Sequence, residues 1–319
     1  MNPGKALEIF VKRLLLCVGF SEVRSDGLYI YDAAAGQMIQ GLGEAHNANV
    51  LLKPPVQTPF FALSRLLVEC KDYNKRIGLG TVRGVLGLKQ DINNFDIVDI
   101  NELNARRNTR RTDLTYKFNR YYYQVAMVSM NGFTLQAQKF AATYRIPLIE
   151  FNKMPFWTRF VDLLSENGVN KGRGSFYSTN KAISDAELET KIVEIADEIG
   201  QSMALAITNS GQLLFLFNRA GKEIDFDDYY QIHWNNQDKG VWRLSSGNCN
   251  YLFQLPSDLM KAWINSSNGE LEMRRNALNC KAEWLSSMVV YYIKNSKPKI
   301  KMISIDRYQL EKAKAYLGS

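Results

Sequence analysis

The sequence contains few of the residues that build metal clusters or disulfide frameworks. It has 4 cysteines and 2 histidines among 319 residues. The cysteines lie far apart, with no CxxC or CxxH spacing, at Cys17, Cys70, Cys249 and Cys280. This pattern argues against a structural zinc site and against a disulfide-stapled fold, and two histidines leave little for a histidine-dependent nucleophile. We therefore expect four reduced cysteines and an intracellular, cytoplasmic protein.

Long apolar runs and low-complexity tracts are also missing. The most apolar stretch, Ile9 to Phe20, is interrupted by Lys12 and Arg13 and is shorter than the roughly 18 to 20 residues of a membrane span. No small-residue cleavage site of a secretory signal follows it. The composition, 46% apolar and 23% charged, is typical of a globular protein with a substantial core. The sequence thus predicts no membrane-spanning segment.

Positive charge is in excess and is concentrated in the first half. The net charge is +8, and residues 1–152 hold 19 Lys or Arg against 13 Asp or Glu, which is +6 of that excess. The densest cluster consists of Arg106, Arg107, Arg110, Arg111, Lys117 and Arg120. Interleaved Asn, Thr and Tyr residues suit phosphate contacts and base stacking. We expect an anionic partner, with nucleic acid first and an anionic membrane surface second; a solvated loop is the alternative for the cluster.

The first half predicts an α/β fold. Apolar residues at three- and four-residue spacing predict an opening helix from Ala6 to Val18. Short apolar runs separated by turn residues predict strands at 27–31, 50–53, 66–70, 122–129 and 146–151, and helices at 81–93 and 135–144. Strands that alternate with helices favour a mixed sheet flanked by helices. These elements make up a predicted first domain, 1–152.

The second half predicts a different organisation. Residues 153–184, rich in Gly, Asn and Ser from 167 to 180, are interpreted as a linker region. A helix is predicted at 185–200, capped by Ser184 or Asp185. Five strands at 203–209, 212–218, 229–234, 241–245 and 251–255 are expected to form an antiparallel meander, followed by helices at 259–265 and 277–293. This second α+β domain, 185–319, has no catalytic motif, and by position it is expected to serve target recognition, sensing or oligomerisation.

The segment that carries chemistry ends a predicted strand. Glu69 and Lys71 stand at i and i+2, so their side chains leave the same face. Another predicted strand, within His46 to Leu52, ends about twenty residues earlier. Metal-dependent hydrolysis of phosphodiesters needs acidic oxygens for a hard cation and a base or cation beside the attacking water, and the backbone carbonyl of Cys70 can add an oxygen. An acid-x-Lys triplet by itself is usually a surface ion pair.

Several segments, taken together, resemble the PD-(D/E)XK nuclease superfamily and, within it, the Mrr-type restriction endonucleases. Gly4 to Phe10 looks like the opening helix of that family, and His46 to Leu52 like its strand with the first metal-binding acid. Val68 to Tyr73 resembles the second catalytic motif, and Ile77 to Gly87 the helix that follows. Residues 125–149 resemble the strand, turn, helix and strand that close the family's core. The similarity covers residues 4–151 in order.

This resemblance implies a restriction-endonuclease-like mixed sheet and a metal-dependent endodeoxyribonuclease of restriction or phage-defence type. It implies that position 49, Glu69 and the Cys70 carbonyl bind Mg²⁺ or Mn²⁺, while Lys71 positions or activates water. DNA would be the partner, and a homodimer the expected assembly. Two other interpretations remain: an RNA-cleaving nuclease, and a catalytically silent nucleic-acid-binding or signal-sensing protein with the same fold.

The sequence departs from the family pattern at Asn49, where an aspartate is expected. A neutral amide oxygen replaces a carboxylate there, so metal binding should fall sharply. Three explanations are open: a deliberate Asp-to-Asn change, which we favour because the substitution is isosteric and the other motifs are intact, a natural pseudo-enzyme, or a site in which Glu44 takes over. His46, Glu8 and Gln90 are further supporting candidates, although each has an ordinary structural interpretation.

Overall fold

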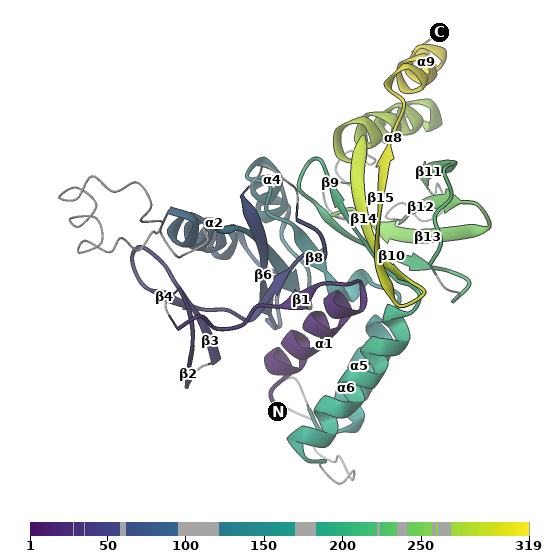
Figure 1. Ribbon diagram of the computed structural model, residues 1–319. Helices are drawn as coiled ribbons and strands as arrows, with labels where there is room; N and C mark the ends of the chain where they lie inside the picture. The colour runs from purple at the N-terminus through teal and green to yellow at the C-terminus, as the bar shows by residue number, and fades with distance from the viewer. Residues whose placement is uncertain are drawn as a thin grey trace, which may run out of the picture.

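The structure is a computed structural model with mixed α/β architecture, in which two large sheets lie side by side (Figure 1). It describes residues 1–27, 29–34, 36–57, 62–94, 121–169, 183–221, 224–234, 241–256, 260 and 269–318. All four cysteines are free thiols, as predicted. Within these ranges no helix combines the length and apolar character that crossing a bilayer requires.

The first sheet is mixed, as the sequence predicted. Its strands lie in the order β1 (Ser21–Glu22), β5 (Val50–Lys53), β6 (Leu63–Lys71), β7 (Tyr121–Ser129) and β8 (Leu148–Glu150). The pairs β6–β7 and β7–β8 are parallel, whereas β1–β5 and β5–β6 are antiparallel. Parallel neighbours need long crossover connections, and helices α2 (Leu79–Asn94) and α4 (Leu135–Thr143) lie in those connections.

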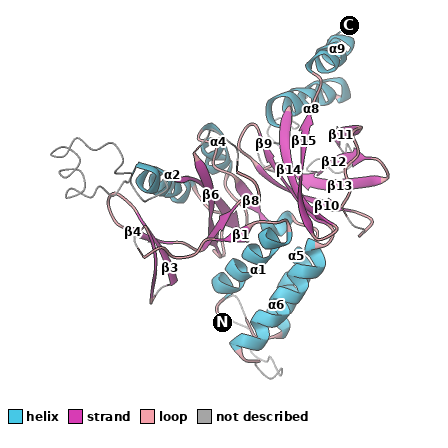
Figure 2. Ribbon diagram, viewed as in Figure 1, coloured by secondary structure: helices cyan, strands magenta, loops and turns pink. Residues whose placement is uncertain are grey.

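Helices cover both faces of this sheet (Figure 2). The opening helix is confirmed as α1 (Pro3–Cys17), which begins after Asn2, whose side chain accepts a hydrogen bond from the Lys5 backbone N–H. Successive residues of a strand point to opposite faces. Val68 of β6 accordingly shares a core with α1, and its neighbour Leu67 shares another core with α2 and α4.

A small antiparallel sheet precedes β5 in the chain. It consists of β2 (Ile30–Ala33), β3 (Gly36–Gln40) and β4 (Ala45–Asn47). The strand predicted at 27–31 therefore starts later, at Ile30. The segment interpreted as one strand, 46–52, is divided: His46 pairs with Ile39 in the small sheet, while Val50 pairs with Val68 in the large one. Asn49 lies at the junction between the two sheets.

The second large sheet has seven strands, and every pairing in it is antiparallel. The order is β11 (Tyr230–Trp234), β12 (Val241–Ser246), β13 (Cys249–Gln254), β10 (Leu213–Asn218), β9 (Met203–Thr208), β14 (Ser287–Lys294) and β15 (Lys297–Ser304). The sheet is strongly curled, because β14 and β15 run at a large angle to β13 in Figure 1. The predicted meander is correct for the pair β9–β10 and for β11 to β13, but it is wrong between them, because β10 pairs with β13 rather than with β11.

The end of the chain corrects another prediction. The helix expected at 277–293 stops early: α8 (Glu270–Trp284) is followed by strand β14. Buried residues alternate along β14 from Met288 to Tyr292, which is the period of a strand with one buried face. Asn295 and Ser296, both with positive φ, form the two-residue turn to β15. Helix α9 (Arg307–Gly318) was not predicted, and the helix expected at 259–265 lies outside the described residues, apart from Met260.

The predicted linker is partly helical. After the short 3₁₀ helix η1 (Phe151–Lys153), α5 (Trp157–Glu166) packs on α1, where the rings of Phe160 and Phe10 stack with centroids 4.5 Å apart. Helix α6 (Asp185–Gly200) is capped by Ser184 through a full capping box. One core cluster includes residues of α1, β6, α5, α6 and β9, so the two sequence halves share a core. Residues 170–182 lie outside the described part, and the division into two domains stays a prediction.

Candidate functional site

Glu69 and Lys71 lie at the end of β6 with their side chains in contact. Lys71 Nζ is 2.9 Å from Glu69 Oε2. Glu69 is only 7% exposed, so its carboxylate is largely removed from water and interacts with the lysine more strongly than a surface pair would. The structure therefore brings together the acid and the lysine that the sequence singled out.

Asn49 reaches the same place from the beginning of β5. Its register partner would be Glu69, because Val50 pairs with Val68 and the two strands are antiparallel. The backbone N–H of Cys70 donates a hydrogen bond to Asn49 Oδ1 at 3.3 Å. Asn49 is thus held against the chain between Glu69 and Lys71, in the position where the family resemblance expects an acid.

Glu8, from the second turn of α1, completes the group. Its Oε1 accepts a hydrogen bond from Asn49 Nδ2 at 2.8 Å, and its Oε2 lies 3.2 Å from Lys5 Nζ. The interpretation of Glu8 as an ordinary exposed helical residue is wrong, since the side chain is only 19% exposed. Lys5 was not predicted as part of this group, although its i,i+3 spacing from Glu8 was a usable signal.

The electrostatics of this group favour a charged lysine and a neutral thiol. Burial lowers the pKa of Lys71, but the charge and hydrogen bond of Glu69 outweigh it, so the pKa of Lys71 is raised. Lys71 is consequently a cation at neutral pH, suited to orienting water and neutralising phosphate charge rather than to removing a proton. Burial, followed by the charges of Glu8 and Glu69, raises the pKa of the Cys70 thiol well above its ordinary value, which makes it unreactive.

The remaining candidates point elsewhere. His46 Nε2 lies 2.6 Å from Asp91 Oδ2 on α2, and Asp91 also accepts the Gly43 N–H. This hydrogen bonding lowers the pKa of Asp91. His46 therefore anchors the small sheet to α2. Glu44 is exposed in the turn before β4, where its backbone oxygen accepts from Gly41. Gln90 is exposed and bonded to Asn94, as expected for a solvated residue.

Glu150 is a buried acid at the carboxyl end of β8, the same end of the parallel strands as Lys71. It ends β8 opposite Ser129 of β7, which pairs in turn with Lys71. Its carboxylate accepts the Phe133 N–H at 3.4 Å. A Cβ on Gly132, where φ is +79°, would come within 2.5 Å of Glu150 Oε1. Glu150 thus supports the turn beyond β7, and this turn requires glycine both for its conformation and for space.

The basic cluster from Arg106 to Arg120 lies outside the described residues, so its predicted contacts with nucleic acid stay a prediction. The densest positive charge of the sequence is in the connection between α2 and β7. That connection follows the helix that packs over the face of β6 on which Leu67 lies.

The donor set fits a divalent cation only in part. Glu8 and Glu69 offer carboxylate oxygens, which hard cations prefer. The amide of Asn49 does not fit, because its nitrogen faces Glu8 and its oxygen accepts a backbone N–H. The described residues accordingly contain no group of three His, Cys, Asp or Glu arranged to hold a metal. A carboxylate at position 49 would supply the third acid.

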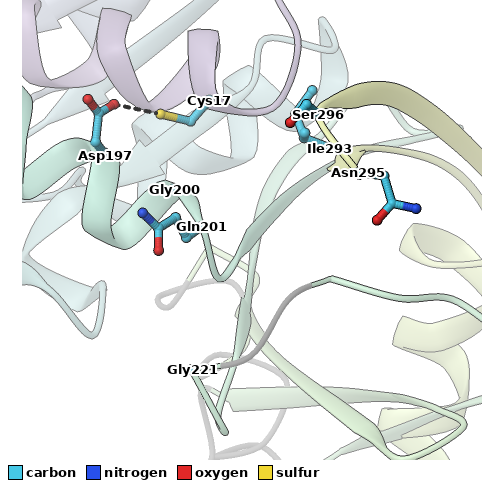
Figure 3. Close-up of a pocket in the computed structure, with 8 residues that line it drawn as sticks. All are labelled: Cys17, Asp197, Gly200, Gln201, Gly221, Ile293, Asn295 and Ser296. Atoms are coloured by element: carbon cyan, nitrogen blue, oxygen red, sulfur yellow. Dashed lines mark hydrogen bonds between the residues drawn. The ribbon is translucent and has the colours of Figure 1, made fainter.

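A separate hollow of about 500 Å³ lies between the ends of α1 and α6 and the β14–β15 turn (Figure 3). Cys17 Sγ donates to Asp197 Oδ1 at 3.2 Å, as the dashed line shows. Burial, and then Asp197, raises the pKa of Cys17 to about 12. Asp197 also forms a two-point ion pair with Arg13, at 2.5 and 2.8 Å. Cys17 and Asp197 are thus engaged in joining α1 to α6.

Comparisons with known proteins give no family. No family model matches the chain, and no curated protein matches it. A crystal structure described as a protein of unknown function, AF1548, is similar with a TM-score of 0.31 and 14% sequence identity, over 52% of this chain and 78% of that one. A likeness at that level carries no argument about function.

Proposed function

We propose that the chain has the fold and site of a metal-dependent phosphodiester hydrolase acting on DNA, with a restriction-endonuclease-like first sheet, and that Asn49 silences it. The observation that carries the proposal is the convergence of Glu8, Asn49, Glu69 and Lys71 on one strand end. Residues from a helix and two strands meet there, which an isolated acid-x-Lys triplet does not require.

The residues have distinct roles in this proposal. Glu8 and Glu69, joined by a carboxylate at position 49, would hold Mg²⁺ or Mn²⁺ together with the Cys70 carbonyl. The bound cation would supply charge neutralisation at the scissile phosphate and a more acidic water. Lys71, kept protonated by Glu69, orients the attacking water and offsets the charge that builds on the phosphate. The substrate is proposed to be DNA and the assembly a homodimer.

A second function, binding without cleavage, is favoured by one specific observation. Both polar atoms of the Asn49 amide have matching partners, a carboxylate that can only accept and a backbone N–H that can only donate. The amide thus replaces a cation as the link between Glu8 and β6. In the chain as written, this arrangement suits a silent protein that binds nucleic acid or senses a signal.

The decisive experiment restores the missing carboxylate. Asn49→Asp is incubated with plasmid, linear DNA, methylated DNA and RNA, with and without Mg²⁺. Asn47→Asp is the matched control, because it adds the same charge two residues away on β4. We expect magnesium-dependent cutting of DNA by Asn49→Asp alone. Absence of cutting under every condition would contradict the enzymatic proposal and leave the binding function, and cutting of RNA alone would change the substrate.

Glu44 provides the complementary test. Its exposed position in the turn before β4 predicts that Glu44→Ala changes little in either background. Efficient cutting by the chain as written, lost in Glu44→Ala, would show that Glu44 is the first ligand and that Asn49 is not.

A further inference from the structure

A second cavity, of about 400 Å³, opens between the two large sheets. Arg65 of β6 and Lys89 of α2 line one side of it, and Leu213 of β10 and Tyr291 of β14 line the other. Arg65 and Lys71 are six residues apart on β6, roughly 20 Å at the rise of an extended strand. The cavity is therefore distinct from the candidate hydrolase site and lies at the opposite end of the same strand.

Among the residues that the structure describes, three cations and no aspartate or glutamate line this cavity. The cations are Arg65, Lys89 and Arg145. Lys89 is 8% exposed and Arg65 is 9% exposed. Neither forms an ion pair with any residue that the structure describes, and neither does Arg145. A buried cation without an anionic partner costs stability, so two in one cavity indicate that an anion belongs there.

Aromatic rings surround the same cations. The Arg65 guanidinium lies 3.4 Å from the ring centroid of Tyr121 and donates to the Tyr123 hydroxyl at 3.0 Å. These contacts fix the orientation of Arg65 without neutralising it. Lys89 Nζ is 5.9 Å from the centroid of the Tyr122 ring. Tyr122 and Tyr144, 45% and 47% exposed, also line the cavity and offer ring surface to an aromatic ligand.

We propose that this cavity binds a free nucleotide, whose phosphates lie against Arg65, Lys89 and Arg145 and whose base stacks on Tyr122 or Tyr144. A nucleotide combines the two properties that the lining requires, a negative charge of two or more and a flat aromatic ring. The volume is within the range of small-ligand pockets, about 300 to 1,000 Å³. Because its walls come from both sheets, the bound nucleotide contacts both at once. This inference does not depend on the hydrolase proposal.

The test is calorimetric titration of the full chain, with Asn49 unchanged, against ADP, GDP, CDP and UDP. Titration with pyrophosphate measures binding of the phosphate groups alone, and titration with adenosine measures binding of the base and sugar alone. A hexadeoxynucleotide tests whether the cavity binds a DNA strand instead. Lys89→Gln removes the buried charge, and Lys139→Gln is the matched control, because Lys139 is exposed on α4 and does not line the cavity. Cleavage is not measured, so the outcome is independent of the nuclease experiment.

We expect at least one diphosphate to bind about tenfold or more tightly than pyrophosphate or adenosine. Lys89→Gln should weaken the affinity for that diphosphate by about tenfold, whereas Lys139→Gln should leave the affinity unchanged. Lys89→Met should raise the melting temperature of the ligand-free protein, since it removes an uncompensated buried charge. No binding of any diphosphate at millimolar concentration, an unchanged affinity in Lys89→Gln, or binding of the hexadeoxynucleotide alone would overturn the proposal.

Discussion

At Asn49 a single atom, the amide nitrogen, distinguishes the two proposed functions. Its amide donates to Glu8 and accepts from the Cys70 N–H, and an aspartate can do only the second. In Asn49→Asp a carboxylate oxygen would face the Glu8 carboxylate at the present 2.8 Å separation. Two anions at that distance either share a proton or bind a cation. Asn49 thus stabilises the ligand-free site, and in the proposed hydrolase it takes the place of a metal-binding carboxylate.

The repulsion between Glu8 and a carboxylate at position 49 predicts that magnesium stabilises the Asn49→Asp variant. In EDTA, Asn49→Asp should lower the free energy of unfolding by about 1 to 3 kcal/mol, because a hydrogen bond is replaced by repulsion. Added Mg²⁺ at roughly ten times its dissociation constant should raise the melting temperature by about 2 °C or more. Thermal unfolding with a magnesium titration measures both effects. The Asn47→Asp control should respond to neither, and an identical magnesium response in both variants would refute a metal site at position 49.

Lys71 gives a second prediction at the same scale. In the Asn49→Asp background, Lys71→Ala should reduce the cleavage rate by about 100-fold or more, because the cation beside the attacking water is lost. DNA affinity should change little, whereas the melting temperature should fall, because the buried Glu69 carboxylate loses its partner, so the rates are compared well below the melting transition. Lys75→Ala is the control, an exposed lysine in the following loop. A residual rate above about a tenth would remove Lys71 from the essential set.

At the scale of elements, the apolar contact between α1 and α6 ends in a close approach at Gly200 and an ion pair at Asp197. A Cβ on Gly200 would come within 2.4 Å of Cys17 Cβ, so glycine allows the close approach of the helices. Beside it, Asp197 bonds to both Arg13 and Cys17. The hydrogen bond from Arg13 lowers the pKa of Asp197. The ionised carboxylate is therefore more favourable in the folded protein than in the unfolded chain.

The lowered pKa of Asp197 makes the stability of the folded protein depend on pH. A lowered folded-state pKa contributes stability above the unfolded value, about 3.9, which is lost as the pH falls through the folded value. Asp197→Asn should therefore melt below the parent protein at pH 6, and the difference should shrink below about pH 4 and vanish at lower pH. Thermal scans across this range test it, with Glu194→Gln on the same helix as the control. A difference in melting temperature that does not change with pH would show that Asp197→Asn acts through packing rather than through the charge of Asp197.

Local sequence patterns predicted the helices and strands whose apolar residues recur with the period of the element. Strand β5 has the predicted bounds, and α1, β6 and β7 were found to within a few residues, because their apolar period matches the face that they bury. The error at β14 arose because no Gly or Pro separates this apolar strand from the helix before it. The helical period of α8 and the alternating period of β14 were therefore interpreted as one helix. Pairing of β10 with β13 is a long-range choice that no local pattern encodes.

The residues of the candidate site likewise include some that the sequence predicted and some that it did not. Glu69 and Lys71 were predictable from an i,i+2 spacing at a strand end, and Asn49 from the preceding strand. The family resemblance offered Glu8 as a supporting residue, but periodicity could not decide its direction, because an amphipathic helix specifies its buried face but not which polar side chain at its border turns inward. The cavity between the sheets has no sequence signature, since its lining comes from segments between Phe20 and Tyr291.

At the scale of the whole molecule, α1 connects the two sequence halves. Phe10 packs on Phe151 of η1 and on Phe160 of α5, and the same core continues into Phe217 of β10. A core shared in this way couples the first sheet to the second. Because the nucleotide cavity lies between the same two sheets, a ligand there is positioned to affect how they pack, and β6 extends from that cavity to the candidate hydrolase site.

The charge distribution gives the last prediction. The first 152 residues carry +6 of the net +8, and the cluster from Arg106 to Arg120 is the densest part of that excess. If these residues contact phosphates, Arg106→Gln combined with Arg110→Gln should weaken DNA binding similarly for all sequences. The slope of log K against log salt should become shallower by roughly 2 units, because each lost contact releases about one counterion fewer.

Fluorescence titrations with duplex DNA at several salt concentrations measure that slope. The control is Lys297→Gln combined with Lys299→Gln, which removes the same charge from β15 in the second sheet. A change of net charge alone affects both variants equally, whereas a phosphate-binding cluster affects only the arginine variant. Equal slopes in the parent and both variants would mean that the cluster is a solvated loop, and the partner of this basic chain would then have to be sought on another surface.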